Sequence, residues 1–173
     1  MIAAEPVSAN VAALRANVAQ HGFTKAVTVV AAALGASPAA DAEVMIYPRM
    51  PGNSTLDPAE KLAVQSPFMR AEMFADARTE RCEIRTLSDI IASEGLHIIH
   101  LLKVDVEGSE LRVFQGVEDR HWPLVQQIVA EVVVVTDRVA SISSLLSSKG
   151  FRVITAAGEP RCNVLLYATR NLQ

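Results

Sequence analysis

The segment from Leu101 to Glu110 constrains the fold more than any other part of the chain, and it reads Leu-Leu-Lys-Val-Asp-Val-Glu-Gly-Ser-Glu. An apolar run leads into three carboxylates within six residues, and Gly108 lies among them just before a predicted helix. A buried strand that ends in acidic residues at a glycine turn is typical of open α/β sheets, whose ligands bind beyond the carboxyl ends of parallel strands. We therefore expect Asp105, Glu107 and Glu110 to lie at such a site, with Glu110 supporting the start of the following helix, where negative charge is favoured.

The composition indicates one soluble globular domain. The 173 residues are 50% hydrophobic and 20% charged, so the chain can bury a sizeable core. The net charge of −3 shows no basic excess, which argues against nucleic acid as a partner. The longest apolar run, at 128–135, is interrupted by Glu131 and is too short to span a bilayer, and the first residues lack the cationic start of a signal peptide. We expect no membrane partner and a cytoplasmic location.

Short β-branched runs alternate with helical stretches along the chain. Strands are predicted at 1–5, 27–33, 98–104, 125–135, 151–155 and 164–169, and helices at 9–20, 88–94, 111–115 and 139–149. This alternation predicts an α/β fold with a Rossmann-like, mostly parallel sheet. The short connection before the last strand predicts an antiparallel C-terminal hairpin.

The segment at about 38–85 interrupts this alternation, and we interpret it as an insertion. Residues 43–47 and 82–85 are predicted to form an antiparallel strand pair. The stretch 48–58 holds three prolines and is predicted to be a loop, with short helices at 58–64 and 67–77.

Several segments, in the same order along the chain, resemble the FkbM-type S-adenosylmethionine-dependent methyltransferases. The most specific are 101–110 and the loop 47–56, which reads Tyr-Pro-Arg-Met-Pro-Gly-Asn-Ser-Thr-Leu. Weaker matches lie at 5–17, 86–91, 125–131 and 145–151. The resemblance implies a single methyltransferase domain over residues 1–173.

The chain departs from the family pattern at two places. Family members normally begin with a strand and a glycine-rich loop for the methionine end of the cofactor, whereas this chain starts at the equivalent of the second strand. The resemblance thus implies an N-terminally truncated domain whose first strand and helix are absent. We expect strands 1–5 and 98–104 to pair directly, or their open edge to mediate a homo-oligomer. The second departure is Glu-Val-Val-Val at 131–134, where the family often has Glu-Val-His-Asp.

The resemblance implies S-adenosylmethionine as the cofactor, bound by Glu5, Ala33, Leu34 and Asp105. A carboxylate such as that of Glu5 suits the ribose hydroxyls because it only accepts hydrogen bonds and takes two donors at once. Ala33 and Leu34 would border the adenine ring. The alternatives are that Glu5 is a surface acid before a proline and that 33–35 is an ordinary strand exit.

Asp105, Glu107 and Glu131 are the catalytic candidates. Asp105 would accept a proton from a substrate hydroxyl or orient the methionine amine, because methyl transfer from an activated sulfonium mainly requires alignment. Glu131 lies in an apolar strand, so it is expected either to emerge beside Asp105 or to meet a partner such as an arginine. Asn53 and Ser54 are predicted to contact the substrate, and a local turn is their alternative.

Two functions remain open from the sequence. The first is O-methylation of a hydroxyl on a small or carrier-bound metabolite, and the second is a catalytically inactive remnant or binding module. The acids at 105, 107 and 131 would also suit Mg²⁺, but their spacing matches no defined metal loop. Cys82, Cys162 and the histidines lack the spacing of zinc ligands, so we predict no metal.

Overall fold

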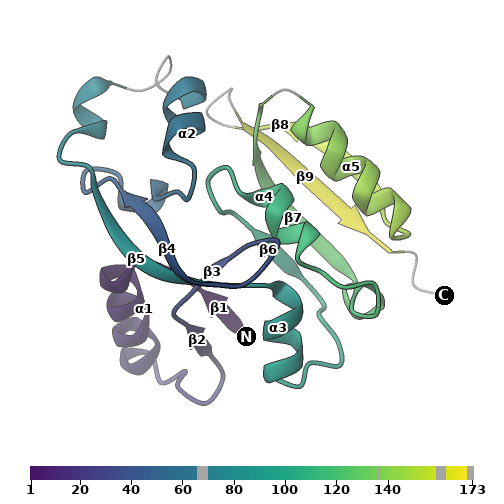
Figure 1. Ribbon diagram of the computed structural model, residues 1–173. Coiled ribbons are helices and arrows are strands. Elements are labelled where there is room, and N and C mark those ends of the chain that lie inside the picture. Colours follow the sequence, from purple (N-terminus) through teal and green to yellow (C-terminus); the bar gives the residue numbers. More distant parts are fainter. Residues whose placement is uncertain (66–69, 136, 159–162, 171–173) are drawn as a thin grey trace.

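The computed structural model describes residues 1–65, 70–135, 137–158 and 163–170, and it has the α/β architecture that the sequence predicts (Figure 1). The strands are β1 (Ile2–Ala4), β2 (Thr28–Val30), β3 (Ala33–Leu34), β4 (Ala39–Ile46), β5 (Arg78–Arg85), β6 (Leu102–Val104), β7 (Gln127–Val133), β8 (Arg152–Ala157) and β9 (Asn163–Thr169). The helices are α1 (Ser8–Gln20), α2 (Pro58–Gln65), α3 (Leu87–Ser93), α4 (Glu110–Gln115) and α5 (Arg138–Ser148), with 3-10 turns η1 (Pro51–Asn53), η3 (Ala71–Phe74) and η4 (Trp122–Leu124). None of these helices is long and apolar enough to cross a membrane.

The described strands form three short sheets. The first pairs β1 with β2, the second has the order β3-β5-β4, and the third has the order β6-β7-β9-β8. Parallel pairing joins β1 to β2, β3 to β5 and β6 to β7, and the other neighbours are antiparallel. The α/β class and the antiparallel hairpin of β8 and β9 are confirmed, and β9 lies between β7 and β8.

Local chemistry explains where several elements begin and end. β1 stops before Pro6, which has no backbone N–H to donate to a ladder. α3 begins with a capping box, in which the Thr86 hydroxyl accepts from the Asp89 N–H and the Asp89 carboxylate accepts from the Thr86 N–H. The hydrogen bond from the Thr86 N–H to this carboxylate is the main cause that lowers the pKa of Asp89 below its ordinary value. α5 is followed by Gly150 at φ 85°, a conformation that favours glycine.

The predicted insertion at 38–85 contains the antiparallel strand pair that the sequence indicates. β4 and β5 pair from Ala39 opposite Ile84 to Ile46 opposite Arg78. α2 begins at Pro58, whose fixed φ suits the first turn of a helix. In the second predicted short helix, at 67–77, η3 covers 71–74, and residues 66–69 lie outside the described part.

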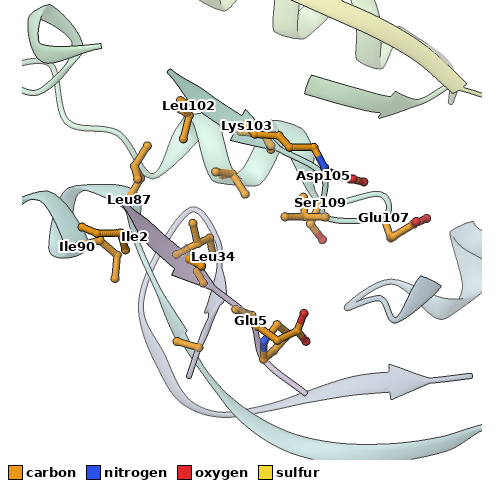
Figure 2. A pocket seen from close by; sticks show the side chains of 18 of the residues that line it. Ile2, Glu5, Leu34, Leu87, Ile90, Leu102, Lys103, Asp105, Glu107 and Ser109 are labelled. Atoms are coloured by element: carbon orange, nitrogen blue, oxygen red, sulfur yellow. Dashed lines mark hydrogen bonds and ion pairs between the residues drawn. The ribbon is translucent and has the colours of Figure 1, made fainter. Parts of the chain in front are cut away.

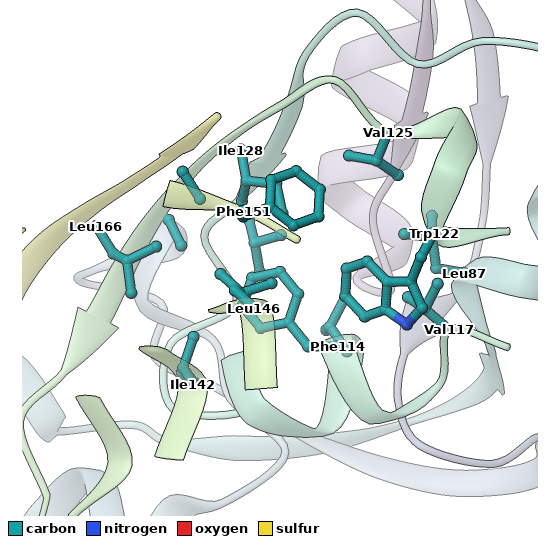
Figure 3. Close-up of a cluster of buried hydrophobic side chains, with 14 of the residues drawn as sticks. Leu87, Phe114, Val117, Trp122, Val125, Ile128, Ile142, Leu146, Phe151 and Leu166 are labelled. Atoms are coloured by element: carbon teal, nitrogen blue, oxygen red, sulfur yellow. The ribbon is translucent and has the colours of Figure 1, made fainter. Parts of the chain in front are cut away.

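Most of the buried apolar side chains form one cluster in the C-terminal half of the chain (Figure 3). Three aromatic rings in this cluster pack against one another. The ring centroid of Trp122 lies 6.5 Å from that of Phe114 in α4 and 6.0 Å from that of Phe151. Ile142 and Leu146 of α5 are fully buried in the same cluster, as their helical spacing predicts. A smaller cluster lies in the N-terminal half and consists of Val7, Ala33, Val44, Ile46 and Cys82.

The expectation that strands 1–5 and 98–104 pair directly is wrong. In the described residues β1 has only β2 as a strand neighbour, and β6 has only β7. The two halves are in close contact elsewhere, since Gly116, after α4, packs so closely on the Gly35 carbonyl that a Cβ at Gly116 would overlap it. Between β1 and β6 the structure has a cavity in place of strand pairing.

Candidate functional site

A cavity of about 900 Å³ lies between β1 and β6, and its two ends differ in chemistry (Figure 2). Glu5, Asp105, Glu107 and Ser109 are at one end, where the two strands finish. The other end is apolar and is lined by Ile2, Leu87, Ile90 and Leu102, among others. The polar end is therefore at the carboxyl ends of the strands, where the sequence predicts a ligand.

Glu5 lies at the mouth of the polar end, directly after β1. Its carboxylate oxygen Oε1 accepts from the Val7 N–H at 2.8 Å and from the Asn10 side-chain amide at 3.3 Å. Both donors belong to the start of α1, so this helix fixes the orientation of the carboxylate. Both hydrogen bonds are made to the same oxygen of Glu5. The residue lines the cavity.

Asp105 follows β6 on the opposite wall of the cavity. Its oxygen Oδ2 lies 2.8 Å from the Lys103 ammonium, in an ion pair with side chains 35% and 68% exposed. Such an exposed pair is weak, because water screens it. The Asp105 carboxylate is thus accessible to a ligand, as the sequence predicts.

Glu107 is placed by a strained turn and a buried lysine. Its φ of 52° is in the left-handed region, and its backbone carbonyl accepts from the Thr55 hydroxyl at 2.8 Å. Its carboxylate lies 2.7 Å from Nζ of Lys61, whose side chain is 1% exposed. Lys61 also donates to Asn53 at 3.0 Å. Glu107 therefore lines the cavity while it ties α2 to the loop after β6.

A second buried charge cluster lies behind this loop. Glu110 is completely buried and accepts from the Gly108 N–H at 2.7 Å, and its other oxygen lies 3.7 Å from Nη1 of Arg138. Arg138 also pairs with Glu60 of α2. Burial raises the pKa of Glu110 to about 7, although the hydrogen bond and Arg138 act in the opposite direction. Glu110 thus supports the start of α4 from inside the protein rather than facing the cavity.

Glu131 lies in β7 directly after Ala130, which pairs with Val104, the residue before Asp105. The Glu131 carboxylate accepts from the Asn163 amide at 2.6 Å, so the partner is an amide and not an arginine. Glu131 is absent from the cavity wall among the described residues. Its predicted catalytic role therefore rests on its neighbourhood to Asp105 alone.

The remaining predicted residues occupy different parts of the site. Ala33 and Leu34 line the cavity, as the predicted adenine contact requires. Ser54 also lines it, whereas the Asn53 side chain is directed to Lys61. In the part of the chain that the structure describes, no cluster of His, Cys, Asp and Glu is arranged to hold a metal ion. Cys82 is a buried free thiol, and Cys162 lies outside the described residues.

The sequence did not indicate three residues of the site. Ser109 is buried on the cavity wall, and its hydroxyl has no hydrogen-bond partner in the structure. Its position within the 101–110 segment is the one sequence feature that could have identified it. No sequence feature identifies Lys61 or Arg138, because each resembles a surface cation of an amphipathic helix until its acidic partner is known.

Comparison with known proteins agrees with this geometry. Residues 1–153 match the family model described as "Methyltransferase FkbM domain". The chain is 33% identical over 168 residues to "Methyltransferase sdnD" of Sordaria araneosa, covering 88% of this chain and 64% of that protein. It is 50% identical over 68 residues to "31-O-demethyl-FK506 methyltransferase FkbM" of Streptomyces tacrolimicus, covering 39% of this chain and 26% of that protein.

The crystal structure of "Methyltransferase FkbM" from Methylobacillus flagellatus KT has a similar fold, with a TM-score of 0.61 and 16% identity. The alignment covers 96% of this chain and 36% of that chain. This chain spans less than two thirds of the length of each of these three proteins. The match to the family model over most of the residues establishes the relationship, and the chain belongs to the FkbM methyltransferase domain family.

Proposed function

We propose that this chain is an S-adenosylmethionine-dependent methyltransferase domain that methylates a hydroxyl oxygen on a small or carrier-bound metabolite. The observation that carries the proposal is the meeting of two strand-end carboxylates, Glu5 and Asp105, at the polar end of one cavity. The FkbM membership supports methyl transfer. The name of the Streptomyces relative, a 31-O-demethyl-FK506 methyltransferase, supports oxygen as the acceptor atom.

The residues of the cavity fit this cofactor. Its volume of about 900 Å³ lies within the range of cofactor sites. Glu5 offers a carboxylate oxygen for two ribose hydroxyls, and Leu34 offers an apolar surface for the adenine ring. The buried Ser109 hydroxyl, which has no partner in the structure, is a polar group that a ligand would satisfy.

The chemistry assigned to the protein is positioning and proton acceptance. When bound, S-adenosylmethionine supplies a methyl group that its sulfonium already activates. Asp105 accepts the proton that the acceptor hydroxyl loses as its oxygen forms the new bond to carbon, and Lys103 orients the Asp105 carboxylate. Glu107 and Lys61 hold the loop after β6 against α2, which excludes water from one side of the site.

A binding module without catalysis is the second candidate. One observation favours it, since Asp105 and Glu107, the catalytic candidates on the cavity wall, each form an ion pair with a lysine. In this case the cavity would bind the cofactor or a related nucleoside without turnover.

Isothermal titration calorimetry with S-adenosylmethionine tests the proposal. We expect a Kd on the order of micromolar, weakened about tenfold or more by Asp105→Ala. Asp119→Ala is the matched control, because Asp119 is also in an ion pair at the surface, with Lys149, but is not part of the cavity wall. No binding at millimolar cofactor would refute both candidates. Binding without methyl transfer to any hydroxylated acceptor of a panel would leave only the binding module.

A further inference from the structure

The turn that follows β6 has two consecutive residues with positive φ. Glu107 has a φ of 52° and Gly108 a φ of 112°. Glycine adopts such angles readily, whereas a residue with a Cβ is strained there. A glutamate therefore keeps this conformation only where the surrounding groups hold it in place.

The surrounding groups that hold the turn come from the segment 53–61. The Thr55 hydroxyl donates to the Glu107 carbonyl at 2.8 Å. Nζ of Lys61 lies 2.7 Å from Oε2 of Glu107 and 3.0 Å from Oδ1 of Asn53. One segment thus holds both the backbone and the side chain of Glu107.

These contacts are shielded from water. Thr55 is 1% exposed, and so is the side chain of Lys61. The segment also packs on the other residue of the turn, since a Cβ on Gly108 would lie 3.3 Å from Oε1 of Glu60. Removing one partner of a buried ion pair leaves a charge without compensation, so the turn cannot keep its geometry when the cation is lost.

Asp105 lies between the last paired residue of β6 and this turn (Figure 2). The ladder with β7 ends at Val104, and Val106 alone separates Asp105 from Glu107. The ion pair of Asp105 with Lys103 holds the carboxylate weakly, because the lysine side chain is largely exposed. The position of the Asp105 carboxylate therefore depends on the backbone of the turn.

We propose that Lys61 and Thr55 are positioning residues, which place the Asp105 carboxylate on the cavity wall by fixing the turn at Glu107. This role rests on the proposed function, in which Asp105 contacts the cofactor and the substrate hydroxyl. Glu107 then contributes through its backbone conformation and its pairing with Lys61, and not as a base.

A double-mutant cycle on cofactor affinity tests this role. Isothermal titration calorimetry gives the Kd for S-adenosylmethionine of the parent chain, of Lys61→Met, of Asp105→Ala and of the variant that carries both substitutions. We expect each single substitution to weaken binding by about tenfold. Because Lys61 acts through Asp105, the double variant should also be weaker by about tenfold, whereas independent effects would give about a hundredfold.

Two conservative variants separate the contributions to the turn. Lys61→Arg keeps a cation beside Glu107, so it should bind the cofactor within about threefold of the parent chain. Thr55→Val keeps the shape of the side chain but removes the hydroxyl that donates to the Glu107 carbonyl. We expect it to weaken binding by about fivefold, as the loss of one buried hydrogen bond implies.

Val125→Ala is the control for a general loss of stability. Val125 is completely buried in the large apolar cluster and is not part of the cavity wall. Its truncation also destabilises the fold, but the variant should bind S-adenosylmethionine with the Kd of the parent chain.

Three outcomes would overturn this role while leaving the proposed function in place. The first is a Kd of Lys61→Met equal to that of the parent chain, and the second is an additive loss of affinity in the double variant. The third is an equal weakening by Val125→Ala. No binding by the parent chain would instead refute the proposed function, and the positioning role with it.

Discussion

The two halves of the molecule are stabilised by different amounts of apolar packing. Among the described residues, the large cluster between Leu87 and Ala168 contains 16 buried apolar residues, whereas the cluster between Val7 and Cys82 contains five. The C-terminal half also has the four-stranded sheet, and the N-terminal half has sheets of two and three strands. Because buried apolar area supplies most of the stability of a domain, the C-terminal half is expected to carry the larger share.

The junction between the halves differs from both clusters. Ion pairs join them beside the polar end of the cavity, where Lys61 pairs with Glu107, and behind the loop after β6, where Glu60 pairs with Arg138. At the other end the strand edges remain apart. The predicted ligand site is thus at the end of the cavity near which charged groups connect the two halves.

The largest expected effect is the loss of an aromatic side chain from the large cluster. Phe114→Ala should reduce the free energy of unfolding by about 3–5 kcal/mol, because it leaves a cavity in a dense core. Urea denaturation monitored by Trp122 fluorescence measures this loss.

A pair of valine truncations tests whether the two clusters differ in packing. Val125→Ala and Val44→Ala each remove two methyl groups from a side chain that is at most 1% exposed. We expect Val125→Ala to cost about 1 kcal/mol more, because its neighbours have less freedom to collapse. Equal losses would contradict the difference between the clusters.

The buried carboxyl of Glu110, at the junction of the two halves, is expected to make the free energy of unfolding depend on pH. The pKa of Glu110 is raised from 4.5 to about 7, so the folded state binds this proton more tightly than the unfolded state. The associated stability is present below pH 4.5, is lost as pH rises through about 7, and amounts to about 3 kcal/mol. Glu110→Gln should remove this pH dependence.

The measurement is urea denaturation at several pH values between 4.5 and 8. Glu94→Gln, at an exposed position after α3, is the control and should follow the parent chain at each pH. If Glu110→Gln shows the same pH dependence as the parent chain, the carboxyl is ionised in the fold throughout this range.

A further expected effect concerns the ion pair that joins α2 to the loop after β6. Lys61→Met leaves the Glu107 carboxylate, 17% exposed, without its buried cation and should cost about 2 kcal/mol. Lys103→Met breaks the exposed pair with Asp105 and should cost about 0.5 kcal/mol or less. Thermal unfolding of both variants measures the difference between the two stability costs. Similar losses of stability would show that the buried ion pair contributes no more than the exposed one.

Much of the fold was predictable from local patterns. The β-branched runs and the helical spacing of Ile142 and Leu146 indicated the type of most elements, because both depend on residues close in sequence. The predicted strand 27–33 is the exception, since it is divided into β2 and β3. The strand-end acids also predicted the position of Asp105 and Glu107 on the cavity wall. Lys61 and Arg138 were not predictable, since their burial depends on acidic partners 46 and 28 residues away.

The amino-acid pattern was enough to place most strands and helices in order, to locate the acidic strand end at 101–110 and to indicate the family of the fold. The three-dimensional packing was needed to show that β1 and β6 remain apart, that the predicted strand 27–33 is divided between two sheets, and that Glu110 is buried while Asp105 faces the cavity. This is because local periodicity sets the conformation of a segment, whereas the spacing between segments depends on contacts between residues distant in sequence. Two such contacts between the halves are Gly116 against Gly35 and the Thr55 hydroxyl against the Glu107 carbonyl.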